Sequence, residues 1–332
     1  MRSLNTPAIV AAGALTLALT GCGAGSALVG VDDAPSQVTT TAPVDAGSAQ
    51  KIAERVIAQA DEAAAAPAAE GQALRERALT GSALAVAIAA SKLEVDPAAT
   101  TTPAPLKRTE APKVLAVSRG TTFPRLILAQ TTTATGAARI NLLTSPDAKT
   151  PFRLSMSVTM APGTQVAALD SLDSGSPMVT KDTRLAVAPD ALVKQYAASL
   201  AYPSPAKAEA VGTDDPFAAS VRANAAAQAK AFGKLATLKQ VHEAQPEQTV
   251  SIALRGGGAL VFSLLERTDT ITLKAGGKSL TPSAEFQRLV KKKTLTTSAE
   301  LKSYETVVFT VPADGTAGVV GADEVLFSAK GS

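Results

Sequence analysis

Apolar and polar side chains alternate strictly over residues 152–160. The apolar members are Phe152, Leu154, Met156, Val158 and Met160, and the polar members are Arg153, Ser155, Ser157 and Thr159. Successive side chains of a β-strand point to opposite faces of a sheet, so this period of two predicts a strand with one face on a core. We expect Met156 and its apolar neighbours to pack against the second of two helices predicted upstream.

The segment before this strand is predicted to hold two helices and three further strands. Ile52, Val56 and Ala60 fall on one stripe at helical spacing, and Pro67 interrupts the pattern. The second helix, over residues 73–92, is apolar nearly all round, so we expect it to be the more deeply buried of the two. The strands are predicted at residues 113–118, 125–131 and 139–144.

The same order of elements recurs in the second half of the chain. Helices are predicted at 189–200 and 217–232, the first opened by Pro189. The strands that follow are predicted at 249–254, 259–266, 270–274, 304–311 and 324–329. Helices followed by antiparallel strands indicate an α+β fold. We predict two tandem domains, 48–175 and 186–332, each a helical pair packed on a curved antiparallel sheet.

Cys22 is the only cysteine of the chain, and it follows Leu19, Thr20 and Gly21. The apolar run before it, residues 8–19, has about a dozen residues, whereas a membrane-spanning helix needs roughly 20. This pattern is typical of a bacterial lipoprotein signal, with a signal peptide at 1–21 and lipidation of Cys22. A plain secretory signal, cleaved near Ala24 or Ala27, is the alternative.

Residues 22–47 consist largely of Gly, Ala, Ser, Thr, Asp and Pro, and we predict a disordered tether there. The formal net charge of the whole chain is only +3, which argues against a nucleic-acid partner. The concentrated basic run is Lys291, Lys292 and Lys293. It fits a solvated loop or strand edge, or a contact with an anionic envelope surface near the membrane.

A search for chemistry yields no catalytic constellation, no metal site and no cofactor site. His242 is the single histidine, and we interpret it as an exposed side chain at a helix end before Pro246. A lone histidine without partners supports neither a histidine-based metal site nor a nucleophilic triad. The acidic pairs are interpreted as solvated loops: Asp214 with Asp215, and Asp323 with Glu324.

Four short segments together resemble a family of actinobacterial envelope lipoproteins of unknown function. They are Leu79-Thr80-Gly81, Thr122-Phe123-Pro124-Arg125, Met160-Ala161-Pro162-Gly163 and Gly257-Gly258-Ala259-Leu260-Val261-Phe262. The resemblance covers nearly the whole chain after the signal. It implies two tandem cone-shaped domains of the nuclear-transport-factor-two-like kind and an extracytoplasmic location. The family has no established activity, so the resemblance adds nothing on catalysis.

These observations favour a non-enzymatic, lipid-anchored binding or scaffold protein on the extracytoplasmic face of the cell membrane. Its expected partners are the membrane itself and an envelope protein or an apolar ligand. The alternative is a cone-fold enzyme, of isomerase or hydrolase type, acting on an apolar envelope metabolite. Convergence of Tyr196, Tyr202, Tyr304 or a buried aspartate with His242 in a closed pocket would favour the enzyme.

Overall fold

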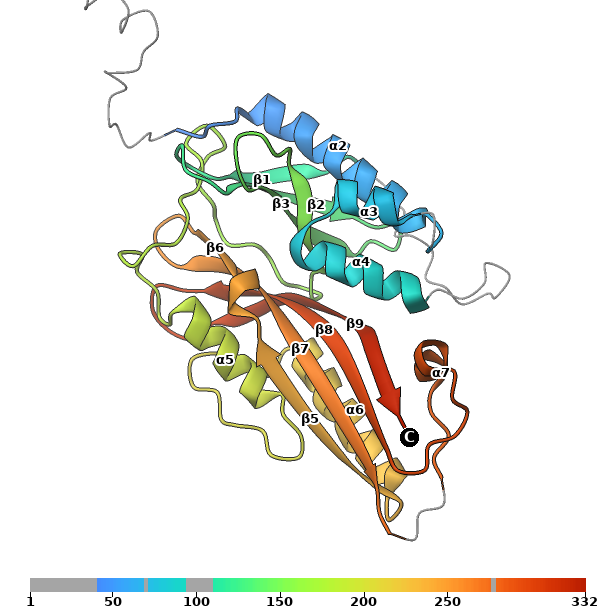
Figure 1. Cartoon of the computed structure of the whole chain (residues 1–332). Helices are drawn as coiled ribbons and strands as arrows, with labels where there is room; N and C mark the ends of the chain where they lie inside the picture. Colours follow the sequence, from blue (N-terminus) through green and yellow to red (C-terminus); the bar gives the residue numbers. More distant parts are fainter. Residues whose placement is uncertain (1–40, 69–70, 94–109, 276–278) are drawn as a thin grey trace, which may run out of the picture. The chain divides into compact units, whose positions relative to one another are not determined.

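The computed structural model describes residues 41–68, 71–93, 110–275 and 279–332, and within them the chain is a mixed α+β protein (Figure 1). The predicted signal peptide and Cys22 lie outside the described residues. The first half contains helices α2 (Ala46–Ala65), α3 (Gln72–Ala78) and α4 (Gly81–Leu93), then strands β1 (Lys113–Val117), β2 (Arg125–Thr132), β3 (Ala138–Ser145) and β4 (Arg153–Thr159). These strands form an antiparallel sheet in the order β1-β2-β3-β4, here called the N-terminal sheet.

The second half repeats the order of helices followed by strands. It contains helices α5 (Pro189–Ser199) and α6 (Pro216–Phe232), strands β5 (Ala236–Ala244), β6 (Val250–Ala253) and β7 (Ala259–Leu273), helix α7 (Ala284–Val290), and strands β8 (Ser298–Val311) and β9 (Gly318–Gly331). A single turn of 3₁₀-helix, η1 (Pro246–Gln248), precedes β6. The C-terminal sheet is antiparallel in the order β5-β7-β8-β9, with β6 paired to β7.

The N-terminal sheet is buried on both faces. On β2, Leu126, Ile127, Leu128 and Ala129 are all fully buried, and they contribute alternately to two different apolar clusters. The cluster on one face contains the buried stripe of α2, including Val56. A continuous apolar run of this kind is typical of a strand covered on both sides.

The prediction that Met156 packs against the second helix is wrong. Met156 belongs to the cluster on the other face, where it packs with residues of the C-terminal sheet such as Phe262. The pairing of β3 with β4 shifts in register between Leu142 and Leu143, opposite Ser155. This bulge turns Leu154, two residues before Met156, into the cluster that contains the helices.

The two sheets therefore share a hydrophobic core. Its members from the second half of the chain include Ile252, Leu260, Phe262, Val308 and Val320 of the C-terminal sheet, and Leu254 directly after β6. A fully buried side chain of this size stabilises a fold by about 1.5–3 kcal/mol. Backbone contacts join the sheets as well: Met160 forms a bridge with Gly321, and Met178 forms a bridge with Ile252. The segment around Met178, which falls between the two predicted domains, is thus hydrogen-bonded along the edge of β6.

The opposite face of the C-terminal sheet carries α5 and α6. Leu192 and Tyr196 of α5 pack there with Val261 and Phe309. A smaller cluster forms at the other end of the same sheet, where Phe286 of α7 packs with Leu295 and Ala299. Several buried polar and charged side chains lie on β5, β7 and β8, among them Gln240, His242, Asp269 and Glu305.

Four local features differ from the sequence-based prediction. The second predicted helix is broken: α3 ends before Leu79, which bridges to Leu154, and α4 starts at Gly81 with a positive φ of 53°. Strand β5 and helix α7 were not predicted. At the start, Asp45 caps α2 and Ala42 donates its backbone N–H to the Asp173 carbonyl, so the last residues of the predicted tether contact the fold.

Candidate functional site

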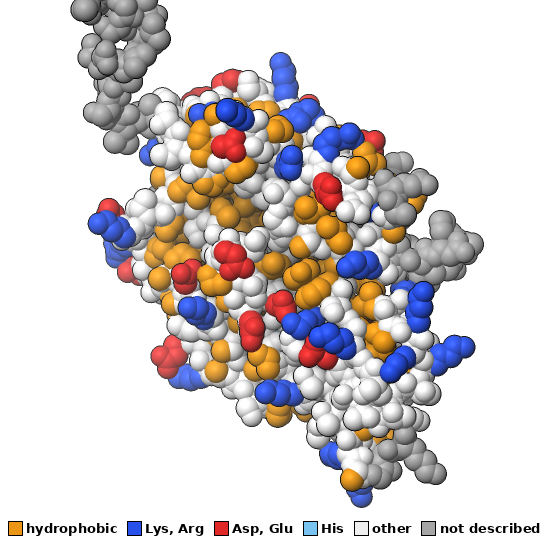
Figure 2. Space-filling model, viewed as in Figure 1, with side chains coloured by type: hydrophobic (Ala, Val, Ile, Leu, Met, Phe, Trp, Pro, Cys, Tyr) orange, Lys and Arg blue, Asp and Glu red, His pale blue; other side chains and the backbone are white. Residues whose placement is uncertain are grey.

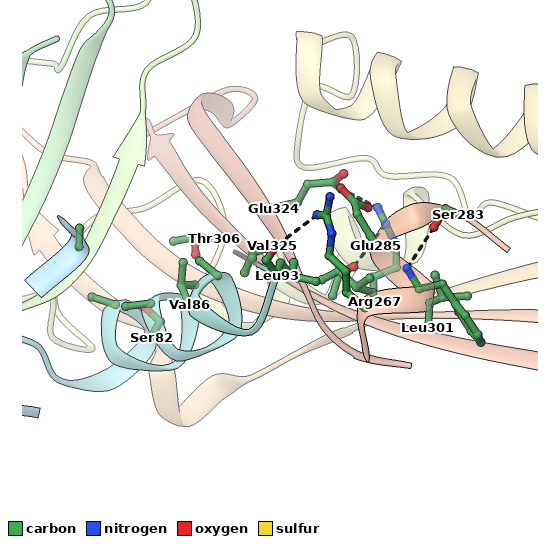
Figure 3. A pocket seen from close by; sticks show the side chains of 18 of the residues that line it. Ser82, Val86, Leu93, Arg267, Ser283, Glu285, Leu301, Thr306, Glu324 and Val325 are labelled. Atoms are coloured by element: carbon green, nitrogen blue, oxygen red, sulfur yellow. Dashed lines mark hydrogen bonds and ion pairs between the residues drawn. The ribbon is translucent and has the colours of Figure 1, made fainter. Parts of the chain in front are cut away.

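A cavity of about 1720 Å³ lies among α2, α4, α7 and both sheets. Its helical side is formed mainly by apolar residues of α2 and α4. Residues of β2, β3 and β4, of β7, β8 and β9, and of α6 and α7 form most of the rest of the wall. Figure 3 shows Ser82 and Val86 of α4 near Thr306 and Val325, with the polar residues Arg267 and Glu324 further along. The cavity is larger than the roughly 300–1,000 Å³ that is usual for a drug-sized ligand.

Helix α4 forms the apolar wall of this cavity through Ala83, Val86, Ala87, Ala90 and Leu93. Hydrophobic side chains are also grouped over the region of α4 in Figure 2. The buried residues of α4 are only Ser82, Ala89 and Ser91, whereas α2 buries Ala49, Ala53, Val56, Ile57, Ala60 and Ala63. The prediction that the second helix is the more buried one is therefore wrong. Ala83, Leu84 and Ala87 pack against the core on the N-terminal sheet, but Val86, Ala90 and Leu93 line the cavity and are not part of that core.

One polar part of the wall is built on Arg139 of β3. Its Nη2 lies 3.1 Å from Asp323 Oδ2, and its Nη1 donates to Thr159 Oγ1 at 2.7 Å. Ser157 accepts from Nε at 3.2 Å. Asp323 also accepts from the backbone N–H of Thr159 at 2.9 Å. The interpretation of Asp323 and Glu324 as a solvated loop is wrong, because both belong to β9 and both are paired with arginines.

A second polar part centres on Arg267 of β7, which contacts three carboxylates. Its Nη1 lies 2.6 Å from Glu324 Oε2 and 3.3 Å from Glu305 Oε1, and its Nε lies 3.2 Å from Asp269 Oδ2. We call Arg267, Asp269, Glu305 and Glu324 the Arg267 cluster. Burial on its own would lower the pKa of Arg267, but the three carboxylates reverse the effect and raise that pKa. The guanidinium is therefore firmly charged.

His242 stands behind the Arg267 cluster, and its interpretation as an exposed residue at a helix end is wrong. It lies on β5 opposite Arg267, with a fully buried side chain whose Nδ1 is 2.8 Å from Glu305 Oε2. Within the described part of the chain, its Nε2 has no hydrogen-bond partner. The alternating burial of β5 is the signal that sequence reasoning missed, because Leu238, Gln240 and His242 share its buried face.

The tyrosines do not gather around the cavity. Tyr196 donates its hydroxyl to Asp215, with both carboxylate oxygens at 3.1 Å, and packs edge-to-face on Phe309. Burial, followed by the charge of Asp215, raises the pKa of Tyr196. Asp215 also caps α6 by accepting from Ala218 N, so it is a structural residue and not a solvated loop. Tyr304 stacks on Phe327 at 3.9 Å between ring centroids.

The predicted basic run follows α7. Lys291 has a left-handed backbone with φ 56° and ends the helix. Lys292 Nζ donates to the Gly331 carbonyl at 2.8 Å. All three lysines, Lys293 included, are exposed. Among the described residues, no group of three histidine, cysteine or acidic side chains is arranged to hold a metal ion.

Comparison with protein-family models, curated proteins and solved structures returns no match to this chain. No helix in the part of the chain that the structure describes combines the length and the hydropathy needed to cross a bilayer.

Proposed function

We propose that this protein is a lipid-anchored, extracytoplasmic binding protein whose cavity takes an apolar ligand. The observation that carries the proposal is the apolar wall of α4, which leaves Val86, Ala87 and their neighbours facing a volume of about 1720 Å³. Keeping apolar surface unfilled costs stability at about 25 cal/mol per Å². A ligand that covers this apolar wall would therefore stabilise the folded protein.

The other parts of the proposal rest on the sequence. The lone Cys22 after an apolar segment supports a lipid anchor on the outer face of the cell membrane, and the exposed Lys291–Lys293 run supports contact with an anionic envelope surface. The resemblance to actinobacterial envelope lipoproteins supports tandem cone-shaped domains. In favour of that finer assignment, each sheet carries helices on the face turned away from the shared core.

Organic extraction of the protein, purified from its own envelope in a mild detergent, tests the ligand directly. Mass spectrometry should find a stoichiometric apolar compound, which would be depleted from Ala87→Phe, because the larger side chain fills the cavity. Ala58→Phe, on the exposed face of α2, is the matched control. Equal recovery from both variants would contradict a ligand in this cavity.

The anchor is tested separately. Cys22→Ala should prevent lipidation and move the protein from the detergent phase to the aqueous phase, or leave an uncleaved precursor. An unchanged partition would contradict the lipoprotein assignment without bearing on the cavity.

One observation favours the enzymatic alternative. Asp269, a buried aspartate that lines the cavity, interacts electrostatically with His242. His242 itself does not line the cavity, and its Nδ1 is bound to Glu305. The described residues therefore place charged groups on the cavity wall. Isomerase or hydrolase chemistry would also need an acid or base that reaches the substrate.

A further inference from the structure

Charge is unbalanced at the polar end of the cavity. In the Arg267 cluster one guanidinium faces three carboxylates, so the cluster has a formal charge of −2, or −1 when His242 is protonated. Excess negative charge in a poorly solvated place is costly unless a cation or hydrogen-bond donor accompanies it.

Two of these carboxylates line the cavity, and they differ in accessibility. The Glu324 side chain is 45% exposed, and Figure 3 shows it pointing to Arg267. The Asp269 side chain is only 8% exposed, and its Oδ1 has no hydrogen-bond partner among the residues that the structure describes. Burial, opposed by the charge of Arg267, raises the pKa of Asp269, as expected for a carboxylate whose charge is not fully compensated.

Two of the arginines that line the cavity are paired with carboxylates. Arg139 is bound to Asp323, Ser157 and Thr159, and Arg267 is bound within its cluster. The third arginine that lines the cavity is Arg288 of α7. Its Nη1 donates to the Leu93 carbonyl at 3.1 Å, and Glu285 lies one turn before it on the same helix. At the Arg267 cluster itself, an anionic group would meet three carboxylates and one guanidinium.

We propose that the ligand is an amphiphile with a basic head group, such as an ammonium, which contacts Glu324 while the apolar part lies along α4. Asp269, which is more deeply buried than Glu324, attracts the same head group through the electrostatic field of its charge. This inference rests on the proposed function, because it names the chemical class of the ligand in the same cavity.

Three probes of equal chain length test the head group: hexadecylamine, hexadecanol and palmitic acid. Each competes with the neutral fluorescent probe N-phenyl-1-naphthylamine on the delipidated full chain at pH 7. We expect the amine to displace the probe at a concentration at least ~10-fold lower than the acid, a difference of roughly 1.4 kcal/mol. The alcohol should fall between them.

Matched variants locate the effect. Glu324→Gln and Asp269→Asn should each bring the amine close to the alcohol, while Glu300→Gln should preserve the wild-type order, since Glu300 is paired with Lys330 outside the cavity wall. Thermal melts show which variants are folded, and the exposed Glu324 makes its variant the less disruptive one.

The outcomes separate this inference from the proposed function. If the fluorescent probe binds but the three competitors rank equally, or the acid binds best, the basic head group is wrong and the apolar cavity stands. An amine preference that survives both Glu324→Gln and Asp269→Asn also overturns the proposed contact. If neither the probe nor any competitor binds the wild-type protein, both proposals fail.

Discussion

Helices α2 and α4 lie on the same side of the N-terminal sheet, yet they use their apolar residues in opposite ways. Helix α2 is amphipathic and buries most of its apolar stripe, with Val56 fully buried and Ile52 partly buried. Helix α4 is more uniformly apolar, yet Val86 and Ile88 remain only half-buried. Hydrophobicity alone therefore did not decide burial. Both helices border the cavity, but the buried residues of α2 pack into the core on the N-terminal sheet. In α4, Val86, Ala90 and Leu93 line the cavity without belonging to that core.

Introducing a charge into each helix should produce the largest contrast. Val56→Asp places a carboxylate in a filled core and should cost several kcal/mol, a large part of the roughly 5–15 kcal/mol by which a domain is stable. Val86→Asp faces the cavity and should cost roughly 1 kcal/mol or less while abolishing binding of apolar probes. Chemical denaturation of both variants measures this, and equal destabilisation would mean that the α4 wall is packed.

The packed core that the two sheets share can be compared with the cavity in the same way. Phe262→Ala removes a fully buried ring from between the sheets and should cost about 3–5 kcal/mol. Because the core joins both sheets, hydrogen exchange monitored by mass spectrometry should show β2 and β7 opening together. Two separate unfolding transitions would instead favour the independent domains, 48–175 and 186–332, that the sequence predicts.

The orientation of α4 depends on Gly81, whose positive φ of 53° follows the bridge at Leu79. Gly81→Ala should cost roughly 1–2 kcal/mol, because a side chain disfavours this backbone conformation. It should also weaken probe binding by shifting the apolar wall. Gly163→Ala has a similar strain at φ 79°, with no atom of the described residues within 4 Å of the added carbon, and should leave binding unchanged.

The smallest effect is expected from a tryptophan introduced as a fluorescent reporter, because the chain contains no tryptophan of its own. Val86→Trp should leave stability within about 0.5 kcal/mol of wild type and give an emission that shifts to shorter wavelength when an apolar ligand fills the cavity. Ala58→Trp, on the exposed face of α2, should show no such shift. A shift in both variants would indicate a general conformational change and would remove the distinction between the two helices.

Local patterns were sufficient for most of the elements. The helix that contains Val56 was predicted from its apolar stripe, and the strand around Met156 from its alternating side chains. Pro189 correctly marked the start of a further helix. These signals work because each depends on residues within one or two turns of the chain. The α+β class followed from their order.

The candidate site could not be predicted in the same way, because its members are distant in sequence. Arg139 and Asp323 meet only when the two sheets pack together, and His242 meets Glu305 only across the C-terminal sheet. An apolar helix also gives no sign in its sequence of whether a core or a cavity faces it. Strand β5 had a detectable signal, the alternating residues around Gln240, which the position of His242 before Pro246 obscured.

The pairing of β7 with β8 has a mechanical consequence for how the cavity opens. The register runs without a shift from Ala259 opposite Val311 to Thr272 opposite Ser298, passing from the shared core to the Arg267 cluster. A ladder with continuous hydrogen bonds resists hinge bending, so this floor is stiff. Entry of the proposed ligand would then require movement of the parts of the wall joined by fewer bonds, such as the contact between Arg288 of α7 and Leu93 of α4. Structures with and without a ligand, superposed on β7 and β8, should differ mainly in the spacing of those two helices.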